Sequence, residues 1–272
     1  MRHQLRLLAT AATFFTRLPW VARWCYPEPE RLGESARYFP LIGLLVGALG
    51  ALVYALALLC WSPGIAAALA LIATALVTGA FHEDGLSDAI DGFGGGYSVA
   101  RKLEIMKDSR IGSFGALALV LICLLKWQAL SELAGWAPLA LLMAHVLARW
   151  APVALSLSLP YVRFEGPNKP IAETIGPREG LWASLWVLSL VPLSLALAHV
   201  LSDGVLDVRS AVQVLFAVLA TTLLCTWLCA RWFRREIGGI TGDTLGAANQ
   251  IVETTVYLAV LAVLGAKPAW PV

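Results

Sequence analysis

The chain has 272 residues, of which 59% are hydrophobic and only 14% are charged, whereas about a quarter of the residues in a soluble domain are charged. Its formal net charge of +2 is too small to indicate a nucleic acid as partner. Composition therefore excludes an ordinary soluble domain and favours an all-α, polytopic integral membrane protein, in which residues 1–272 form one domain embedded in the lipid bilayer.

Apolar stretches of spanning length, roughly 17–25 residues, recur along the chain. The amphipathic segment 4–18 comes first, and its pattern suits a helix lying in the membrane interface or a shallow additional crossing. Seven transmembrane helices are predicted after it, or eight crossings if segment 4–18 is included, at 38–60, 65–82, 112–130, 137–158, 181–201, 210–230 and 251–267.

The positions of lysine and arginine predict the orientation. If the N-terminus is cytoplasmic, sixteen of the 20 Lys and Arg residues fall on the cytoplasmic side, and only Arg209 and Lys267 fall on the other. This asymmetry follows the positive-inside rule. It also places the polar loops 82–111, 160–180 and 231–250 on one face, as expected for an enzyme with a single cytoplasmic active site.

Four acids occur within nine positions next to the second predicted span: Glu83, Asp84, Asp88 and Asp91. The three aspartates are spaced i, i+4, i+7, so in a helix they would share one face within an arc of roughly 60°. Acids this dense beside a membrane are costly unless something binds them, and Mg²⁺ prefers oxygen ligands. We therefore expect the four acids to form a magnesium site, with Glu83 as an outer ligand or as the partner of a basic residue. A solvated acidic helix end is the alternative.

Glycines at 92 and 94–96 and then a basic segment follow the acids. The glycine run is compatible with close approach of the backbone to a ligand, or with a flexible connection between two helices. Lys107 and Arg110 suit phosphate and would stabilise negative charge that develops on a leaving group. Asp108 lies between them and would complete the metal site or accept a proton. These features predict a membrane enzyme that performs magnesium-dependent chemistry on a phosphate ester.

A second polar segment, GGITGDTLGAANQIVE at 238–253, leads into the last predicted span. Asp243, Gln250 and Glu253 are spaced to share one helix face, and the start of the helix offers free N–H groups to an anion. A capped helix whose Asn249 and Gln250 make interhelical hydrogen bonds is the alternative. Arg149 lies in the middle of a span, either as a functional residue or packed against a backbone carbonyl.

The sequence FHEDGLSDAIDGFGGG at 81–96, followed by RKLEIMKDSRIGSFG at 101–115, resembles the cobalamin synthase family, the adenosylcobinamide-GDP ribazoletransferases. The sequences FFTRLP at 14–19 and TGDTLGAANQIVE at 241–253 are also similar to that family's pattern. The resemblance covers nearly the whole chain. It implies a transferase that joins α-ribazole, or its 5′-phosphate, to adenosylcobinamide-GDP and releases GMP.

On this resemblance, the ribose 3′-hydroxyl would attack the phosphorus attached to the aminopropanol arm of the corrinoid. The product would be adenosylcobalamin or its 5′-phosphate. Asp84, Asp88 and Asp91 would hold one or two Mg²⁺ ions that bridge the diphosphate, and Lys107 and Arg110 would neutralise phosphate oxygens.

The resemblance also assigns roles to residues outside the acidic face. Asp91 or Asp108 would accept the proton of the attacking hydroxyl. Asp243 and Asn249 would contact the nucleotide or help the metal. Independently of the resemblance, an arginine inside a span is expected to be functional, and Arg149 would then face the same cavity. The enzyme would lie in the cell inner membrane with its active site facing the cytoplasm, and association with other enzymes of the cobalamin pathway is compatible with this placement.

Three rival functions share parts of this pattern. A CDP-alcohol phosphotransferase uses the same logic, but its signature places Ala-Arg after the second Asp-Gly, where this chain has Phe93 and Gly94 after Gly92. A membrane prenyltransferase would carry paired aspartate motifs on two helices, which the segment 238–253 matches only in part. A divalent-cation transporter would carry acids near the bilayer midplane and internal repeats, whereas these acids lie at the end of a span.

Overall fold

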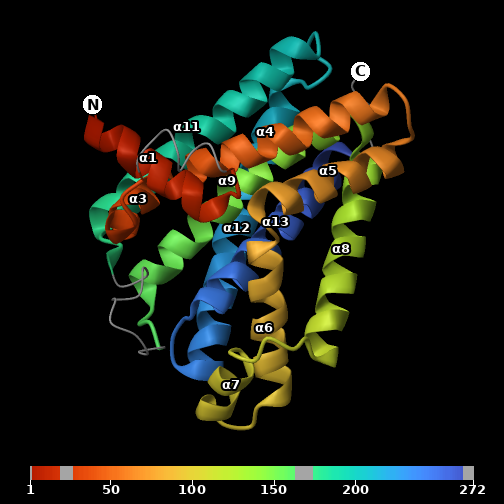
Figure 1. Ribbon diagram of the computed structural model, residues 1–272. Coiled ribbons are helices and arrows are strands. Elements are labelled where there is room, and N and C mark those ends of the chain that lie inside the picture. Colours follow the sequence, from red (N-terminus) through yellow and green to blue (C-terminus); the bar gives the residue numbers. More distant parts are fainter. Residues whose placement is uncertain (1, 19–26, 163–173, 266–272) are drawn as a thin grey trace.

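The computed structural model describes residues 2–18, 27–162 and 174–265, which form a bundle of helices (Figure 1). Within these ranges the regular structure is helical, apart from an isolated β-bridge between Tyr161 and Ile240. The predicted all-α fold is confirmed. The elements are α1 Arg2–Phe15, η1 Pro29–Arg31, α3 Leu32–Ser35, η2 Ala36–Tyr38, α4 Phe39–Leu58, α5 Pro63–Thr78, α6 Phe81–Gly95, α7 Val99–Ile105, α8 Ser113–Leu133, η3 Ala134–Trp136, α9 Ala137–Ser158, α11 Pro177–Leu201, α12 Val208–Ile237 and α13 Gly242–Leu264.

Helix α9 forms the centre of the bundle and is buried along most of its length. Helices α4, α11 and α13 pack around it. Gly43 and Gly47 allow α4 to approach closely, since a Cβ at Gly43 would lie 2.2 Å from the carbonyl oxygen of His145, and one at Gly47 would lie 2.7 Å from that of Leu141. Small residues at such crossings are typical of membrane bundles, where close packing of backbones holds the helices together.

The outward faces of α4, α5, α8, α11 and α12 carry large apolar side chains. Leu76 on α5 is 73% exposed and Phe216 on α12 is 71% exposed, and many leucines on the same helices are more than half exposed. An apolar outer surface of this extent is costly in water. A bilayer accepts it, and the chain is therefore a multi-pass membrane protein.

Five segments of the described chain are long and apolar enough to cross a membrane, or six if the bent pair α5 and α6 forms one crossing. One of the five, Ser113–Ser158, contains both α8 and α9, of 21 and 22 residues. Each of these helices is about 30 Å long, so the total depends on whether both cross. The predicted number of seven spans stays a prediction.

The predicted span 65–82 is interrupted in the structure. Helix α5 ends at Thr78, Gly79 and Ala80 adopt left-handed conformations with φ of 66° and 55°, and α6 leaves at 88° to α5. With 16 residues, α5 is about 24 Å long and too short to cross a bilayer alone. Because of the break, the acidic residues lie on a separate helix, α6, which does not continue in the direction of α5.

The glycine run also differs from its expected role. Helix α6 continues to Gly95, so Gly92 and Gly94 are helical rather than part of a loop. A Cβ at Gly92 would lie 2.7 Å from the side chain of Met106, and one at Gly94 would lie 2.7 Å from the ring of Phe114. The glycines therefore serve the packing of α6 against the segment that follows it.

The connections between helices gather at two ends of the bundle. Figure 1 shows the α6–α7–α8 and α12–α13 connections toward the lower end, and the α4–α5, α8–α9 and α11–α12 connections toward the upper end. Loops 82–111 and 231–250, which the lysine and arginine pattern assigns to one face, thus lie toward one end, whereas residues 163–173 of loop 160–180 lie outside the described residues.

Candidate active site

Helix α6 carries the predicted acidic face and crosses the first turn of α13. Gly85 makes the crossing close, because a Cβ there would lie 3.0 Å from the carbonyl oxygen of Asp243 and 3.2 Å from Cα of Gly246. Asp84 is exposed and Asp88 is partly buried. Since residues 84, 85 and 88 lie on one side of a helix, both carboxylates border the start of α13.

Asp91 lies on the same helix but binds the start of α8. Its Oδ2 accepts a hydrogen bond from the backbone N–H of Gly112 at 2.7 Å, and its Oδ1 accepts one from Gly115 at 2.8 Å. The first N–H groups of a helix lack intrahelical partners and favour negative charge. Asp91, on α6, therefore caps the N-terminus of α8. This capping role competes with the predicted roles of Asp91 as metal ligand and base.

Glu83 turns away from the other acids into the interior. Its Oε1 accepts a hydrogen bond from Gln250 Nε2 at 3.1 Å, and its Oε2 is buried without a partner. Lys126 joins the same group, since its Nζ donates to Gln250 Oε1 at 2.6 Å and to Glu253 Oε1 at 2.7 Å. The hydroxyl of Tyr257 donates to the same oxygen of Glu253 at 3.1 Å. Helices α6, α8 and α13 are thus joined by buried charges.

Helix α9 extends this buried network. His145 Nδ1 lies 3.5 Å from Glu253 Oε2 and 3.1 Å from Arg149 NH1. Arg149 also donates to the carbonyl oxygen of His145 at 3.2 Å and lies over the ring of Phe15, 5.6 Å from its centroid. This contact is the alternative stated for Arg149 from the sequence, and its role toward a ligand stays a prediction. Arg149 and Lys126 together face Glu83 and Glu253, so the formal charges in the network balance.

Asn249 takes part in helix packing. It is fully buried, and its Nδ2 donates to the carbonyl oxygen of Ala148 on α9 at 3.0 Å. The helical donor for that carbonyl would be the N–H of residue 152, but Pro152 has none. Asn249 therefore replaces a hydrogen bond that the proline removes, and its predicted contact with the nucleotide stays a prediction.

The basic segment after α7 is at the surface. Arg110 forms a two-pronged ion pair with Asp108, with Nε at 3.0 Å from Oδ1 and NH2 at 2.6 Å from Oδ2. These hydrogen bonds from Arg110 lower the pKa of Asp108 to about 2. A carboxylate of such low pKa is a weak base, which argues against Asp108 as the proton acceptor. Lys107 is exposed nearby.

Helix α13 begins with a complete capping box. Thr241 accepts a hydrogen bond from the N–H of Thr244 at 3.2 Å, and Thr244 accepts one from the N–H of Thr241 at 2.8 Å. Asp243 lies in this first turn. A Cβ at Gly242 would meet nothing within 4 Å, so the turn borders open space.

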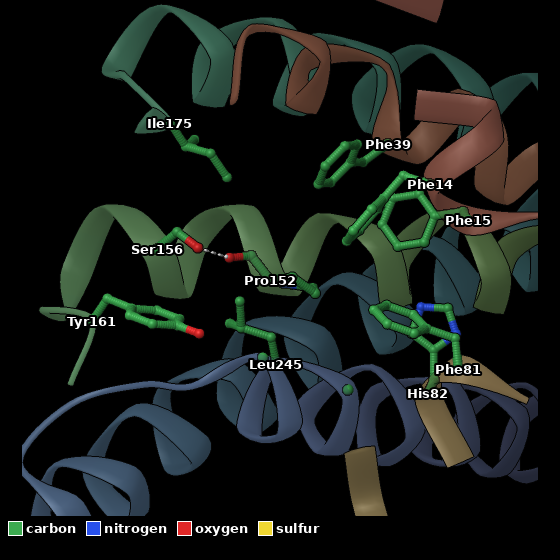
Figure 2. Close-up of a pocket in the computed structure, with 12 residues that line it drawn as sticks. Phe14, Phe15, Phe39, Phe81, His82, Pro152, Ser156, Tyr161, Ile175 and Leu245 are labelled. Atoms are coloured by element: carbon green, nitrogen blue, oxygen red, sulfur yellow. Dashed lines mark hydrogen bonds between the residues drawn. The ribbon is translucent and has the colours of Figure 1, made fainter. Parts of the chain in front are cut away.

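That space is a partly open pocket between α1, α4, α6, α9 and α13, with an internal cavity volume of about 90 Å³. Figure 2 shows Phe14 and Phe15 above it and Phe81 and His82 at one side. His82 is 3% exposed, and its Nε2 has no hydrogen-bond partner. The residues that line the pocket are Phe14, Phe15, Phe39, Phe81, His82, Pro152, Ser156, Tyr161, Ile175, Gly242, Leu245 and Gly246.

The four predicted metal ligands do not converge. Across the described ranges, the structure holds no group of three or more His, Cys, Asp or Glu side chains arranged for a metal ion, since Glu83 binds Gln250 and Asp91 caps α8. Magnesium, however, usually takes one or two carboxylates and completes its shell with water and substrate phosphates. Asp84 and Asp88 fit that smaller set of ligands.

The sequence reasoning gave no role to Lys126, His82, His145 or Tyr257. The sequence does indicate a partner for Lys126. A lysine in the middle of a span requires one, and Glu253 is the acid of another span. The histidines and the tyrosine carry no such signal, since their place in the network depends on how the helices pack.

The fold and site define a polytopic helical membrane protein with an acidic helix at the start of a capped helix. The sequence model of the family described as Cobalamin-5-phosphate synthase matches residues 7–261. An "Adenosylcobinamide-GDP ribazoletransferase" of Shewanella piezotolerans is 46% identical over 270 residues, covering 96% of this chain and 97% of the relative. Proteins of the same description from Shewanella pealeana and Ralstonia nicotianae are 47% and 43% identical, covering 97% and 96% of this chain and 97% of each relative. The comparison with solved structures found no match. The chain belongs to the cobalamin-5-phosphate synthase family, whose members are enzymes.

Proposed function

We propose that this chain transfers α-ribazole, or its 5′-phosphate, to adenosylcobinamide-GDP and releases GMP, the last assembly step of cobalamin biosynthesis. The observation that carries the proposal is the family match across residues 7–261. The structure supports it with a site suited to a diphosphate: two carboxylates, Asp84 and Asp88, border the capped N-terminus of α13.

The two phosphorus atoms of the diphosphate are joined by a bridging oxygen. The reaction breaks the bond between that oxygen and the phosphorus that carries the aminopropanol arm. It forms a bond from the same phosphorus to the ribose 3′-oxygen. GMP leaves with the bridging oxygen, and the proton of the 3′-hydroxyl passes to the departing phosphate or to water. Phosphoryl transfer depends chiefly on positioning and charge neutralisation. Asp84 and Asp88 would hold Mg²⁺, which when bound supplies positive charge to the diphosphate oxygens.

The chain's own residues would position the diphosphate and balance its charge. The N–H groups at the start of α13 favour an anion, and Lys107 and Arg110 add positive charge from the exposed segment after α7. The attacking hydroxyl needs no strong base when the transition state is loose. This agrees with a site in which Asp108 is paired with Arg110 and Asp91 caps α8.

We place the enzyme in the cell inner membrane with the active site toward the cytoplasm. The support is the distribution of lysine and arginine in the sequence, together with the position of α6, α7 and the start of α13 at the same end of the bundle.

The test is an assay of the purified protein in lipid nanodiscs with adenosylcobinamide-GDP, α-ribazole and Mg²⁺, analysed by mass spectrometry. We expect a cobalamin product and GMP in equal amounts, and neither when Mg²⁺ is removed by a chelator. Folded protein that yields no product would refute the proposed reaction. A product formed equally well with the chelator present would refute the magnesium site alone.

A further inference from the structure

The pocket beside His82 has no role in the reaction as described above, although it adjoins the acidic face. Phe81 and His82 line it, and Asp84 lies one helical turn after Phe81 on the same side of α6. Gly242 also lines it, and Asp243 follows directly on α13. A molecule seated in the pocket would therefore have its far end next to the carboxylates, within about one helical turn, or roughly 5 Å.

The walls of the pocket are aromatic rings held against one another. Phe14 and Phe39 are nearly parallel, with an interplanar angle of 13° and centroids 6.1 Å apart. Phe14 meets Phe81 edge to face at 5.3 Å, and His82 stacks on Phe15 at 5.5 Å. Rings fixed in this way offer faces and edges to a flat aromatic guest at little cost in side-chain entropy.

The pocket has few polar atoms. The hydroxyl of Ser156 is already used, since it donates to the carbonyl oxygen of Pro152 at 2.8 Å. His82 Nε2 is buried without a partner, and an unpaired buried polar atom is costly unless a ligand supplies its hydrogen bond. The hydroxyl of Tyr161 also lies at the pocket (Figure 2). The pocket therefore suits a planar ring with few polar atoms at its edge.

We propose that this pocket binds the aromatic base of the ribazole substrate, with His82 Nε2 hydrogen-bonded to the base and the ribose directed toward Asp84 and Asp88. The assignment rests on the proposed function for the identity of the substrate. Guanine is the less suitable guest, because several donors and acceptors on its edge would be left unpaired against phenylalanine. A corrin ring is too large for a cavity of about 90 Å³, one wall of which is formed by α13.

Steady-state kinetics of Phe39→Leu and Phe81→Leu test the proposal, because leucine keeps apolar volume and removes the ring. Phe216→Leu, on the outer face of α12, is the matched control. We expect KM for α-ribazole to rise roughly ten- to a hundredfold in the pocket variants. KM for adenosylcobinamide-GDP should not change in any of the three. His82→Phe should raise KM for α-ribazole about fivefold, and His82→Gln less.

Equal rises in both KM values, or pocket variants that behave like Phe216→Leu, would overturn the assignment. A direct binding assay with the free base of α-ribazole and nanodisc-held protein tests the pocket assignment separately from the proposed reaction. If the wild-type protein makes no product but binds the base saturably, and Phe39→Leu does not, the reaction is wrong and the pocket assignment holds. Absence of saturable binding by the wild type, or a phospholipid retained by the wild type and lost from Phe39→Leu, would refute the pocket assignment.

Discussion

The backbone of Gly115 holds the carboxylate of Asp91 in place. The N–H of Gly115 donates to Asp91 Oδ1 at 2.8 Å, and a Cβ at Gly115 would lie 2.4 Å from Asp91 Oδ2. The carboxylate fits against the start of α8 only because position 115 has no side chain. The pair fixes α6, with its acidic face, to the first turn of α8.

Asp91→Asn should therefore lower stability more than it changes the affinity for magnesium. The amide nitrogen would place a donor against one of the two N–H groups, which leaves a buried group unpaired at a cost of about 1–3 kcal/mol. Thermal unfolding in detergent should show a lower Tm, as should Gly115→Ala. The magnesium concentration for half-maximal activity should stay at the wild-type value. A large increase in that concentration, with Tm unchanged, would restore Asp91 as a metal ligand.

Asp84→Asn and Asp88→Asn should have the opposite effects. Neither residue is buried, and each borders the start of α13, where we place the diphosphate. We expect Asp88→Asn to abolish turnover and Asp84→Asn to lower it at least a hundredfold. The Tm of Asp84→Asn should stay within about 2 °C of the wild type, because Asp84 is exposed and changes at exposed sites are small. Glu104→Gln, on the exposed surface of α7, is the control. An active Asp88→Asn enzyme would remove Asp88 from the site.

Lys126→Met should be strongly destabilising. Lys126 and Glu253 are both 3% exposed and 2.7 Å apart, and removal of one partner of a buried ion pair costs about 3–5 kcal/mol because the other charge stays unpaired. The double variant Lys126→Met with Glu253→Gln should recover part of the loss, as a neutral glutamine needs less compensation. Unfolding in detergent measures both. A double variant as unstable as the sum of the two single variants would mean that the two side chains are not coupled.

Much of this architecture could be predicted from sequence, and the failures have physical causes. The spacing of Asp84, Asp88 and Asp91 correctly predicted a helix, because that period is a property of the chain itself. The spacing could not show that Asp91 binds the start of α8, because this contact depends on where α8 begins, some 20 residues later in the chain. Glu83 was separated from the aspartates by the same periodicity, but its partner Gln250 lies 167 positions away. The aromatic pocket brings together residues from five helices, and no local pattern marks it.

Asp108 should contribute nothing to the acidic limb of the pH–rate profile. Its hydrogen bonds with Arg110 lower its pKa to about 2, below the ordinary value of 3.8. The pair is therefore intact above pH 4 and is lost only as the pH falls through about 2. Between pH 5 and 8, Asp108→Asn should shift no apparent pKa of kcat. A shift of the acidic limb in this variant would show that Asp108 titrates during turnover and would reinstate it as the base.

Pro152 and Asn249 offer the sharpest test of the core. Pro152 deprives the carbonyl oxygen of Ala148 of its helical donor, and Asn249 Nδ2 supplies one at 3.0 Å. Asn249→Ala should cost about 1–3 kcal/mol because this buried carbonyl loses its partner. Pro152→Ala restores an N–H at residue 152, so Asn249→Ala should cost less in that background than in the wild type. Unfolding of the four proteins in one detergent gives the coupling energy. Activity adds a second reading, because a residue that contacts the nucleotide would lose turnover in both backgrounds, whereas a packing residue regains it with stability. Equal costs in both backgrounds would show that the amide of Asn249 does not replace the bond removed by the proline.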